Sequence, residues 1–539
     1  MISISRRIGI REIGLSYLIV LVVGAVCVFT VPYLVIDETR YLTVAWEMHL
    51  NRSFFVPTLN NEFYSHKPPL LFWLINLNWF MLGVNEITLR FIPLLFSLLN
   101  LLMTYRIGLK LWGDVRTAAF ATLILSSMFV YLLWSPLIMF DILLTFWVLL
   151  GVYGFLVGAE DKKRRVSWLL VSLSIAGGLL TKGPVILVHV LPLGVMYFIW
   201  VSKEEAFGGR WYLRLGLAVL MGVGTAMIWV VPATMTGGEE YGKAILWSQT
   251  ADRMVSSMAH QRPIWWYIPI LPVLIFPWIL IGHPWMGKSD LKLKWNYRFI
   301  AVWIGSSIGL FSLISGKQLY YLVPTLPAFS LLIGRAISRL PRELYGFWTF
   351  HRRIGATYVG LGCTLTVLAG CVWVQEKEIP SSLVATLGIG LIFVGAVLFI
   401  FRSRTIDGSI RGIAILSVIA LIVFLVAVHP LFASRYDVRN VARILKEKQE
   451  AGYEIVNSLK YFGQYHFVGR LERPLVVITE IESIGEYINN NKKVLIISYE
   501  ERDKNFDQTN VLYNQLYRGG RLIIWNKKGV QEFIEGRLR

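Results

Sequence analysis

Residues 13–35 read IGLSYLIVLVVGAVCVFTVPYLV and lead directly into IDETRY, residues 36–41. A transmembrane helix needs about 20 mostly apolar residues, and this run exceeds that length. Arg6, Arg7 and Arg11 precede it, as in a signal peptide, but the run is too long for one and lacks a small-residue cleavage site. We therefore predict an uncleaved first span, which leaves the polar residues of DETRY at a membrane surface.

The rest of the chain continues this apolar character. Of its 539 residues, 55% are hydrophobic and only 16% are charged, and the mean hydropathy is +0.57. A soluble chain is typically about one quarter charged, so a string of soluble domains is excluded. The three cysteines, Cys27, Cys363 and Cys371, lie within apolar runs, so neither a disulfide framework nor a thiolate metal site is expected. The composition indicates an integral membrane protein.

Thirteen apolar segments are long enough, or nearly long enough, to be membrane spans. They are 13–35, 87–109, 117–135, 142–158, 167–181, 184–200, 212–235, 263–283, 299–315, 319–338, 354–375, 383–402 and 412–433. A further segment, 69–84, is short, follows Pro68 and contains Asn76 and Asn78. We interpret it as a helix that lies in the membrane interface without crossing.

Basic residues set the predicted orientation, because cytoplasmic loops accumulate Lys and Arg. With a cytoplasmic N-terminus, every basic loop falls on the cytoplasmic side, from Arg106/Lys110/Arg116 to Arg402/Arg404/Arg411. Counting 69–84 as a span would reverse this pattern. Loops 36–86 and 236–262 are then external. The net charge of +19 reflects this topology, and without a basic stripe interleaved with aromatics we expect no nucleic-acid partner.

The C-terminal tail differs in composition from the remainder. Residues 435–539 hold 32 charged residues in 105, against 55 in the preceding 434. Short β-rich runs at 475–479, 494–498 and 522–525 alternate with polar helical stretches such as 438–449. We predict a transmembrane domain over 1–434, carrying the site on its two long external loops, and a small external α/β domain over 435–539.

The first external loop holds the densest group of candidate site residues. Asp37 and Glu38 follow the first span directly, and Arg40 and Lys67 supply cations in the same loop. Ionisable groups at a membrane surface are functional candidates by default. A carboxylate can accept a proton while cations stabilise a phosphate leaving group. In the alternative interpretation, Asp37 simply caps an amphipathic helix that runs to about His49.

Four other polar motifs fall on the same predicted side. They are Asp141 in a short turn, Thr181-Lys182-Gly183-Pro184, the run from His260 through Arg262 to Tyr267, and Ser315-Gly316-Lys317 followed by Tyr320 and Tyr321. Asp141 has an alternative interpretation as a helix cap, and Gly183 and Pro184 alone would explain a turn at Lys182. Chance would scatter these motifs over both faces, so their coincidence predicts one external site.

Taken in order, these motifs resemble those of bacterial membrane glycosyltransferases of the C-type fold. The matching features are DETRY followed by EM, Y-x-x-K-P-P-L, an Asp in the next external turn, LLTKGP, and SGK-x-x-Y-L-x-P. In pattern they are most similar to the aminoarabinose transferases of lipid A and the protein O-mannosyltransferases, glycosyltransferase families 83 and 39. The resemblance covers about residues 1–435. It implies thirteen spans, interfacial helices in the first external loop and, for the aminoarabinose transferases, a small periplasmic domain at the C-terminus.

The resemblance also implies an activity and a set of site residues. These families transfer a sugar with inversion from a polyprenyl phosphate to an acceptor outside the membrane. The matches are Asp37 and Asp141 as acids beside Glu38, Arg40, Lys67 and Arg262 as cations at the lipid phosphate, and Tyr41, Tyr64, Tyr320 and Tyr321 as cavity-lining aromatics. We expect undecaprenyl phosphate-linked 4-amino-4-deoxy-L-arabinose as donor, lipid A phosphate as acceptor, and a monomer in the bacterial inner membrane with its C-terminal domain in the periplasm.

One residue departs from the family pattern. The aminoarabinose transferases carry Glu before the lysine, where this chain has His66, and there the Glu resembles a metal ligand paired with a His at the position of His260. His66 and His260 could bind a structural zinc ion, but two ligands do not complete a tetrahedral site, so a role without metal is favoured. The departure leaves two alternatives open: a protein O-mannosyltransferase-like or other glycan-modifying enzyme, and a lipid-linked sugar transporter. A transporter usually shows repeated halves, and the sequence has no internal repeat.

Overall fold

The computed structural model describes most of the chain as two compact units. It covers residues 2–160, 165–201, 209–245, 261–281, 294–341, 348–369, 381–401, 403, 405–491, 493–502, 508–526, 529–530 and 534. The first unit comprises Met1–Val28, Ser65–Leu71 and Asn85–Ala427. The second comprises Phe29–Tyr64, Phe72–Val84 and Val428–Arg539. The predicted boundary between residues 434 and 435 stays a prediction.

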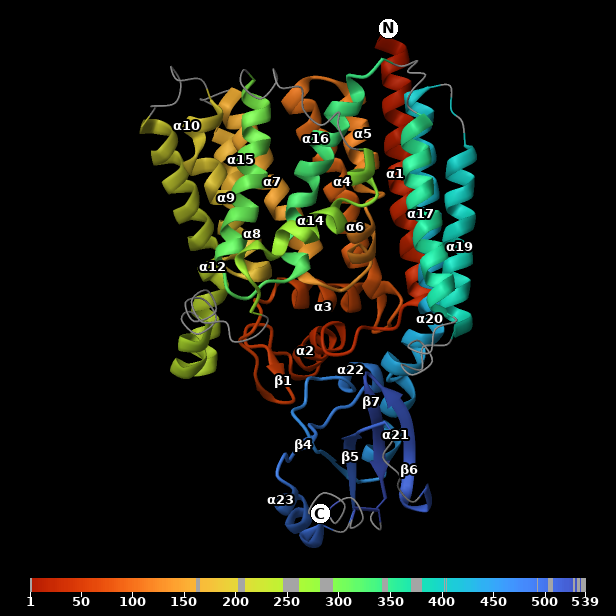
Figure 1. The fold of residues 1–539 in the computed structure, drawn as a ribbon. Coiled ribbons are helices and arrows are strands. Elements are labelled where there is room, and N and C mark those ends of the chain that lie inside the picture. Colours follow the sequence, from red (N-terminus) through yellow and green to blue (C-terminus); the bar gives the residue numbers. More distant parts are fainter. Residues whose placement is uncertain are drawn as a thin grey trace. The chain divides into compact units, whose positions relative to one another are not determined.

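The first unit is helical (Figure 1). Its elements are α1 (Ile2–Thr30), η1 (Thr88–Arg90), α4 (Phe91–Trp112), α5 (Val115–Leu125), α6 (Phe129–Trp134), α7 (Phe140–Glu160), α8 (Arg165–Lys182), α9 (Val185–Val195), α10 (Tyr197–Trp200), α12 (Gly209–Lys243), η3 (Ile264–Trp266), α14 (Tyr267–Ile275), η4 (Trp278–Ile281), α15 (Trp295–Leu313), η6 (Leu319–Thr325), α16 (Leu326–Ser338), α17 (Trp348–Ala369), α19 (Ser381–Ile400) and α20 (Ile406–Tyr436). Both α1 and α20 continue into the second unit.

Each of the thirteen predicted segments contains helix in its described part. Within the described residues, seven helical segments are long and apolar enough to cross a membrane: Gly9–Thr30, Thr88–Trp112, Phe140–Glu160, Gly209–Lys243, Leu319–Ser338, Ser381–Ile400 and Ile406–Glu450. The predicted class, a polytopic helical membrane protein with a small sheet in its C-terminal part, is confirmed. The number of helices that cross stays a prediction.

Some predicted spans are divided into two shorter helices. The apolar periodicity of the sequence did not indicate these divisions. Segment 117–135 divides into α5 and α6, because the Ser126 and Ser127 hydroxyls donate to the Leu123 carbonyl, 3.0 and 2.7 Å away, where the helix ends. Such back-bonding of serine competes with the regular helical pattern. Segment 184–200 divides into α9 and α10 at Met196, whose ψ of 22° departs from the helical value.

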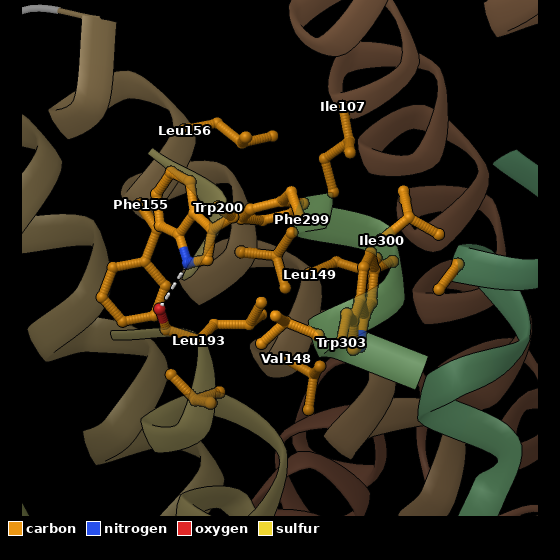
Figure 2. Packing of buried hydrophobic residues seen from close by; sticks show 14 of the residues in the cluster. Ile107, Val148, Leu149, Phe155, Leu156, Leu193, Trp200, Phe299, Ile300 and Trp303 are labelled. Carbon is orange, nitrogen blue, oxygen red and sulfur yellow. Dashed lines mark hydrogen bonds between the residues drawn. The ribbon is translucent and has the colours of Figure 1, made fainter. Parts of the chain in front are cut away.

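A large apolar core in the first unit packs around α7. Val148, Leu149 and Phe155 of this helix are buried among side chains of neighbouring helices, including Trp200 of α10 and Trp303 of α15 (Figure 2). The indole N–H of Trp200 donates to the Leu193 carbonyl at 2.9 Å, which supplies the partner that a buried tryptophan needs. This core holds the helix whose first turn carries Asp141.

Helices α17 and α19 approach each other through glycines. A Cβ added to Gly362 would lie 2.5 Å from the Gly388 carbonyl oxygen, and one added to Gly355 would lie 2.6 Å from that of Gly395. Small residues allow such close backbone approach in membranes, where van der Waals packing drives helix association. Gly360 of α17 has open space around it instead.

We expect Gly362→Leu to destabilise the protein by about 1–3 kcal/mol, because the new side chain must displace the α19 backbone. Gly360→Leu makes the same chemical change on the same helix and should leave stability close to that of the parent. Thermal unfolding of both variants in the same detergent measures the difference. Equal shifts would show that the two helices do not depend on this contact.

The second unit contains α2 (Glu38–Asn51), the hairpin β1 (Thr58–Leu59) and β2 (Glu62–Phe63), and most of α3 (Leu70–Leu82). At 13 residues α3 is about 20 Å long, too short to cross a bilayer. Its Phe72, Ile75 and Trp79 are buried, whereas Phe80 and Met81 are exposed. This one-sided exposure suits the interfacial helix predicted over 69–84.

The C-terminal part of the second unit is a mixed α/β fold. Its elements are α21 (Arg439–Glu450), β3 (Glu454–Asn457), α22 (His466–Gly469), β4 (Val476–Val477), α23 (Ile481–Asn490), β5 (Val494–Glu500), η7 (Gln508–Asn510), β6 (Val511–Tyr517) and β7 (Gly520–Trp525). The strand order is β4-β3-β5-β7-β6, with β3 parallel to both neighbours and the β5–β7–β6 part antiparallel. The sequence predicts β4, β5, β7 and α21 but not β3 and β6.

Candidate functional site

Asp37 lies at the start of α2, immediately after a strained turn. Ile36 has a φ of +81°, which is costly for a β-branched residue and occurs mainly where surrounding structure enforces it. Its N–H donates to the Thr39 hydroxyl at 3.1 Å, which holds the turn. Asp37 makes no side-chain cap bond to α2, so the interpretation of this residue as a helix cap is wrong. Its carboxylate is about half exposed and instead accepts a hydrogen bond from Arg40 Nη2 at 3.1 Å.

Arg40 is largely buried, with its guanidinium 5.3 Å from the ring of Tyr41. Burial favours a lower pKa for Arg40, but the Tyr64 and Tyr41 hydroxyls and the Asp37 carboxylate outweigh it and raise the pKa. Burial also raises the pKa of Tyr41, so its hydroxyl stays protonated. The second unit therefore presents a permanent cation and a carboxylate side by side.

Glu38 is buried in the same turn. Its Oε2 accepts a hydrogen bond from the Leu34 N–H at 2.9 Å, so its carboxylate joins the residues before the turn to the first turn of α2. This bond joins the backbone on the two sides of Asp37. The catalytic role predicted for Glu38 stays a prediction.

In the first unit, Asp141 pairs with Lys182. Lys182 Nζ lies 2.5 Å from Asp141 Oδ1, and both side chains are almost fully buried. Asp141 lies in the first turn of α7 and Lys182 in the last turn of α8, where the helix dipoles favour these respective charges. Nζ also lies 5.0 and 5.1 Å from the ring centroids of Tyr320 and Tyr321 on η6. The tyrosines predicted as cavity residues thus surround a cation.

Lys182 is the residue that sequence analysis did not include among the site residues. A signal was present: Asp141 and Lys182 are isolated charges at the ends of apolar segments on the same predicted side. Buried charges are expensive unless paired, so each implied a partner. Which partner each takes depends on how α7 and α8 pack.

Lys67 and Arg262 each contact an aromatic ring of the first unit. Lys67 Nζ lies 5.6 Å from the ring of Phe140, the residue before Asp141, and the Arg262 guanidinium lies 5.9 Å from the ring of Trp266. Arg262 is also fixed through its backbone, because its N–H donates to the Ser315 carbonyl at 3.2 Å and its carbonyl accepts from Lys317 Nζ at 3.0 Å. The Ser315-Gly316-Lys317 motif thus holds the segment that carries Arg262.

The predicted site residues divide between the two units. Asp37, Glu38, Arg40, Tyr41 and Tyr64 belong to the second unit, and His66, Lys67, Asp141, Arg262, Tyr320 and Tyr321 to the first. His260 lies outside the described residues, together with the rest of 246–260 in the second loop predicted to be external. Among the described residues, no group of three His, Cys, Asp or Glu side chains could hold a metal ion. Binding of zinc by His66 and His260 stays a prediction, because His260 is not among the described residues.

Comparisons with known proteins agree with the motif resemblance. Residues 14–238 match the dolichyl-phosphate-mannose-protein mannosyltransferase family model. The undecaprenyl phosphate-alpha-4-amino-4-deoxy-L-arabinose arabinosyl transferase of Pseudomonas aeruginosa is 29% identical over 357 residues, which cover 64% of this chain and 62% of the relative. The enzyme of that name from Pectobacterium atrosepticum is 28% identical over 311 residues, 56% of this chain and 55% of the relative. These matches span less than two thirds of the relatives' lengths.

Solved structures extend the likeness in fold to nearly the whole chain. ArnT from Cupriavidus metallidurans bound to undecaprenyl phosphate superposes with a TM-score of 0.78 at 18% identity, covering 95% of this chain and 97% of that one. The apo state of the same protein gives a TM-score of 0.75. The chain therefore has the C-type glycosyltransferase fold of a multi-pass membrane protein, and the resemblance predicted from its motifs is confirmed.

Proposed function

We propose that this multi-pass membrane protein of the C-type glycosyltransferase fold is an inverting glycosyltransferase with a lipid-phosphate-linked sugar as donor. Its relatives are named for transfer of 4-amino-4-deoxy-L-arabinose from undecaprenyl phosphate. We propose the same donor here and lipid A phosphate as acceptor. The reaction takes place on the periplasmic face of the bacterial inner membrane, with the N-terminus in the cytoplasm and the C-terminal domain in the periplasm.

The observation that carries this proposal is the pair of Asp37 and Arg40 at the start of α2. The half-exposed carboxylate remains open to a substrate, while the guanidinium beside it stays charged. An acid next to a fixed cation suits transfer from a phosphate, in which an acceptor must be oriented or deprotonated and a leaving group stabilised. The strained turn at Ile36 fixes the direction of the backbone immediately before Asp37.

In the proposed reaction, an acceptor oxygen attacks the anomeric carbon of the donor as the bond from that carbon to the phosphate oxygen breaks. The leaving polyprenyl phosphate takes the bonding electron pair, and Arg40, Lys67 and Arg262 are the cations proposed to stabilise its charge. A hydroxyl acceptor gives its proton to Asp37, and an ionised phosphate acceptor needs only to be oriented. One displacement at the anomeric carbon inverts its configuration.

Asp141 has a different proposed role from Asp37. Asp141 is buried and paired with Lys182, and it holds the Lys182 ammonium beside Tyr320 and Tyr321. The tyrosine rings add a favourable environment for the cation. We therefore assign Asp141 to the positioning of Lys182.

A second candidate function follows from the family match over residues 14–238, whose description names a mannosyltransferase that acts on protein. His66, which replaces the glutamate of the aminoarabinose transferases, also separates this chain from them. A different sugar or a protein or glycan acceptor would use the same acid and cations. A transporter of lipid-linked sugars, in contrast, would leave the donor intact.

The test is release of polyprenyl phosphate by the purified full-length protein. We expect undecaprenyl phosphate to appear from labelled 4-amino-4-deoxy-L-arabinosyl undecaprenyl phosphate when lipid A is added. Lys67→Ala should raise the KM for the donor about ten- to a hundredfold, the size of a charge-assisted hydrogen bond to phosphate. Lys110→Ala, which removes a lysine paired with Glu160, should leave this KM unchanged.

Three results would contradict parts of this proposal. An intact donor with every acceptor tried would remove the transferase assignment. Transfer to a protein or glycan but not to lipid A would favour the second candidate. A normal donor KM for Lys67→Ala would exclude Lys67 from the phosphate site.

A further inference from the structure

The C-terminal α/β domain contacts α2 through the loop that follows strand β3. In open α/β sheets this position, outside the carboxyl ends of parallel strands, is where ligands usually bind. Here the Gly463 carbonyl of that loop accepts a hydrogen bond from the Thr43 hydroxyl of α2 at 2.6 Å. Gly463 has a φ of +78°, and an added Cβ would lie 2.7 Å from Leu59 and 3.0 Å from Thr43. A segment of the same chain thus occupies the edge at which such domains bind ligands.

Two further hydrogen-bonded contacts lie beside the first. The indole N–H of Trp46 donates to the Leu471 carbonyl at 2.8 Å. The Asn60 side chain, next to the β1 strand, donates to the Leu475 carbonyl at 2.9 Å and accepts from the Leu475 N–H at 2.8 Å. Both backbone groups of Leu475 are therefore satisfied by one side chain from the first external loop.

Aromatic side chains fill the space between these hydrogen bonds. The ring of Phe467 on α22 stacks on Trp79 of α3 at 5.2 Å and meets Trp46 of α2 edge-on at 6.5 Å. The Arg470 guanidinium covers this group, 4.0 Å from the Phe467 ring and 5.7 Å from Trp46. Such aromatic pairs have preferred geometries, so the cluster restricts how α2 can rotate.

The chain on the other side of Asp37 is also held by the C-terminal domain. Val35, two residues before Asp37, is buried in the hydrophobic core of that domain together with Val441, Leu445 and Ile455, and Ile36 packs against the same core. Asp37 therefore lies between two attachments to one domain, Val35 before it and Thr43 and Trp46 after it.

The hairpin is joined to α2 by a buried carboxylate. Glu47 accepts hydrogen bonds from the Thr58 hydroxyl at 2.7 Å and from the N–H groups of Asn60 and Asn61 at 2.5 and 3.0 Å. The middle of α2 is thus fixed to both the hairpin and the C-terminal domain. Thr43 lies six residues after Asp37, about 9 Å along the helix axis, so a rotation of α2 about Thr43 also moves Asp37.

We propose that the C-terminal α/β domain is a positioning element for the catalytic carboxylate of Asp37. By holding Val35, Thr43 and Trp46 it sets the rotation and tilt of α2, and thereby the direction of Asp37 and Arg40. These contacts act through Asp37 and touch no substrate, so Thr43 and Trp46 are positioning residues. The inference rests on the proposed function, in which Asp37 orients or deprotonates the acceptor. A displacement of about 1 Å at such a group can cost 10²-fold in rate.

The test compares pairs of matched variants in the full-length protein. Trp46→Phe and Trp525→Phe each remove a buried 2.8 Å indole hydrogen bond, but Trp525 donates to Ser498 within the sheet, away from α2. Thr43→Val removes the hydroxyl that reaches Gly463 while keeping the shape of the side chain, and Thr43→Ser retains the hydroxyl. Each variant is assayed for kcat, for donor KM and for hydrogen exchange of the α2 backbone amides.

We expect Trp46→Phe and Thr43→Val to lower kcat about tenfold or more, with donor KM within about twofold of the parent. Exchange of the α2 amides should become faster in both. Trp525→Phe should lower thermal stability without changing kcat or α2 exchange, and Thr43→Ser should restore kcat. A purely structural role would instead make Trp46→Phe and Trp525→Phe equivalent.

The outcomes separate this inference from the proposed function. Equal kcat values for Trp46→Phe, Trp525→Phe and the parent, in a protein that Asp37→Asn inactivates, would overturn the positioning role alone. Absence of transfer by the parent would overturn the function. Even without transfer by the parent, hydrogen exchange tests whether the domain fixes α2. If the α2 amides exchanged as slowly in Trp46→Phe and Thr43→Val as in the parent, the domain would not fix α2.

Discussion

Asp37→Asn is expected to lower kcat for sugar transfer to a hydroxyl acceptor by about 10²–10⁴-fold, the contribution typical of a general acid–base group. The amide oxygen can still accept the hydrogen bond that Arg40 donates at 3.1 Å, so the local geometry should persist. An amide cannot take a proton from the acceptor hydroxyl. The measurement is initial rate with saturating donor and acceptor, together with donor binding, which should remain close to that of the parent.

Glu62→Gln is the control for Asp37→Asn. Glu62 is an exposed carboxylate on β2 in the same unit, so this change also removes one negative charge. It should leave kcat unchanged, and both variants should insert and purify as the parent does. Near-normal transfer by Asp37→Asn would exclude Asp37 as the catalytic carboxylate.

Lys182→Met is expected to be the most destabilising single change considered. It leaves Asp141 buried without the ammonium that lies 2.5 Å from its carboxylate. Breaking a buried pair from one side typically costs about 3–5 kcal/mol, because the remaining charge is uncompensated. Thermal unfolding in detergent should show a large loss of stability, and transfer activity should fall with it because the cation beside Tyr320 and Tyr321 is lost.

A double-mutant cycle separates these two effects. Asp141→Asn combined with Lys182→Met removes both charges, so stability should recover well beyond the sum of the single changes, while activity should not. Lys110→Met removes a lysine whose partner Glu160 is mostly exposed, and such surface pairs contribute about 0–1 kcal/mol. If Lys182→Met were no more destabilising than Lys110→Met, the buried pair would not matter to the fold.

Several features of the site could be predicted from the sequence, each for a local reason. Asp37 follows an apolar run, so its place shortly after the first span needs no tertiary information. The predicted end of that span at residue 35 was wrong, because the helix ends at Thr30 and Val35 is buried in the core of the C-terminal α/β domain. The position of Asp141 beside a helix start and the pairing of tyrosines at 320 and 321 are likewise properties of short segments. The alternative interpretation of Asp37 as a side-chain helix cap was wrong. Its carboxylate accepts a hydrogen bond from Arg40 and none from the α2 backbone, and this depends on a turn geometry that the sequence does not specify.

The sequence by itself determined that the chain is a helical membrane protein with a charged C-terminal part. The length of an apolar run and the composition of a segment can be read without knowing which residues meet in the fold. Only the tertiary structure decided the partners. Lys182 pairs with Asp141 across 41 positions, and Thr43 bonds to Gly463 across 420. Such contacts arise from the packing of whole elements, and many residues at those separations have suitable chemistry. For that reason the attachment of α2 to the C-terminal domain, on which the direction of Asp37 depends, appears only in the folded chain.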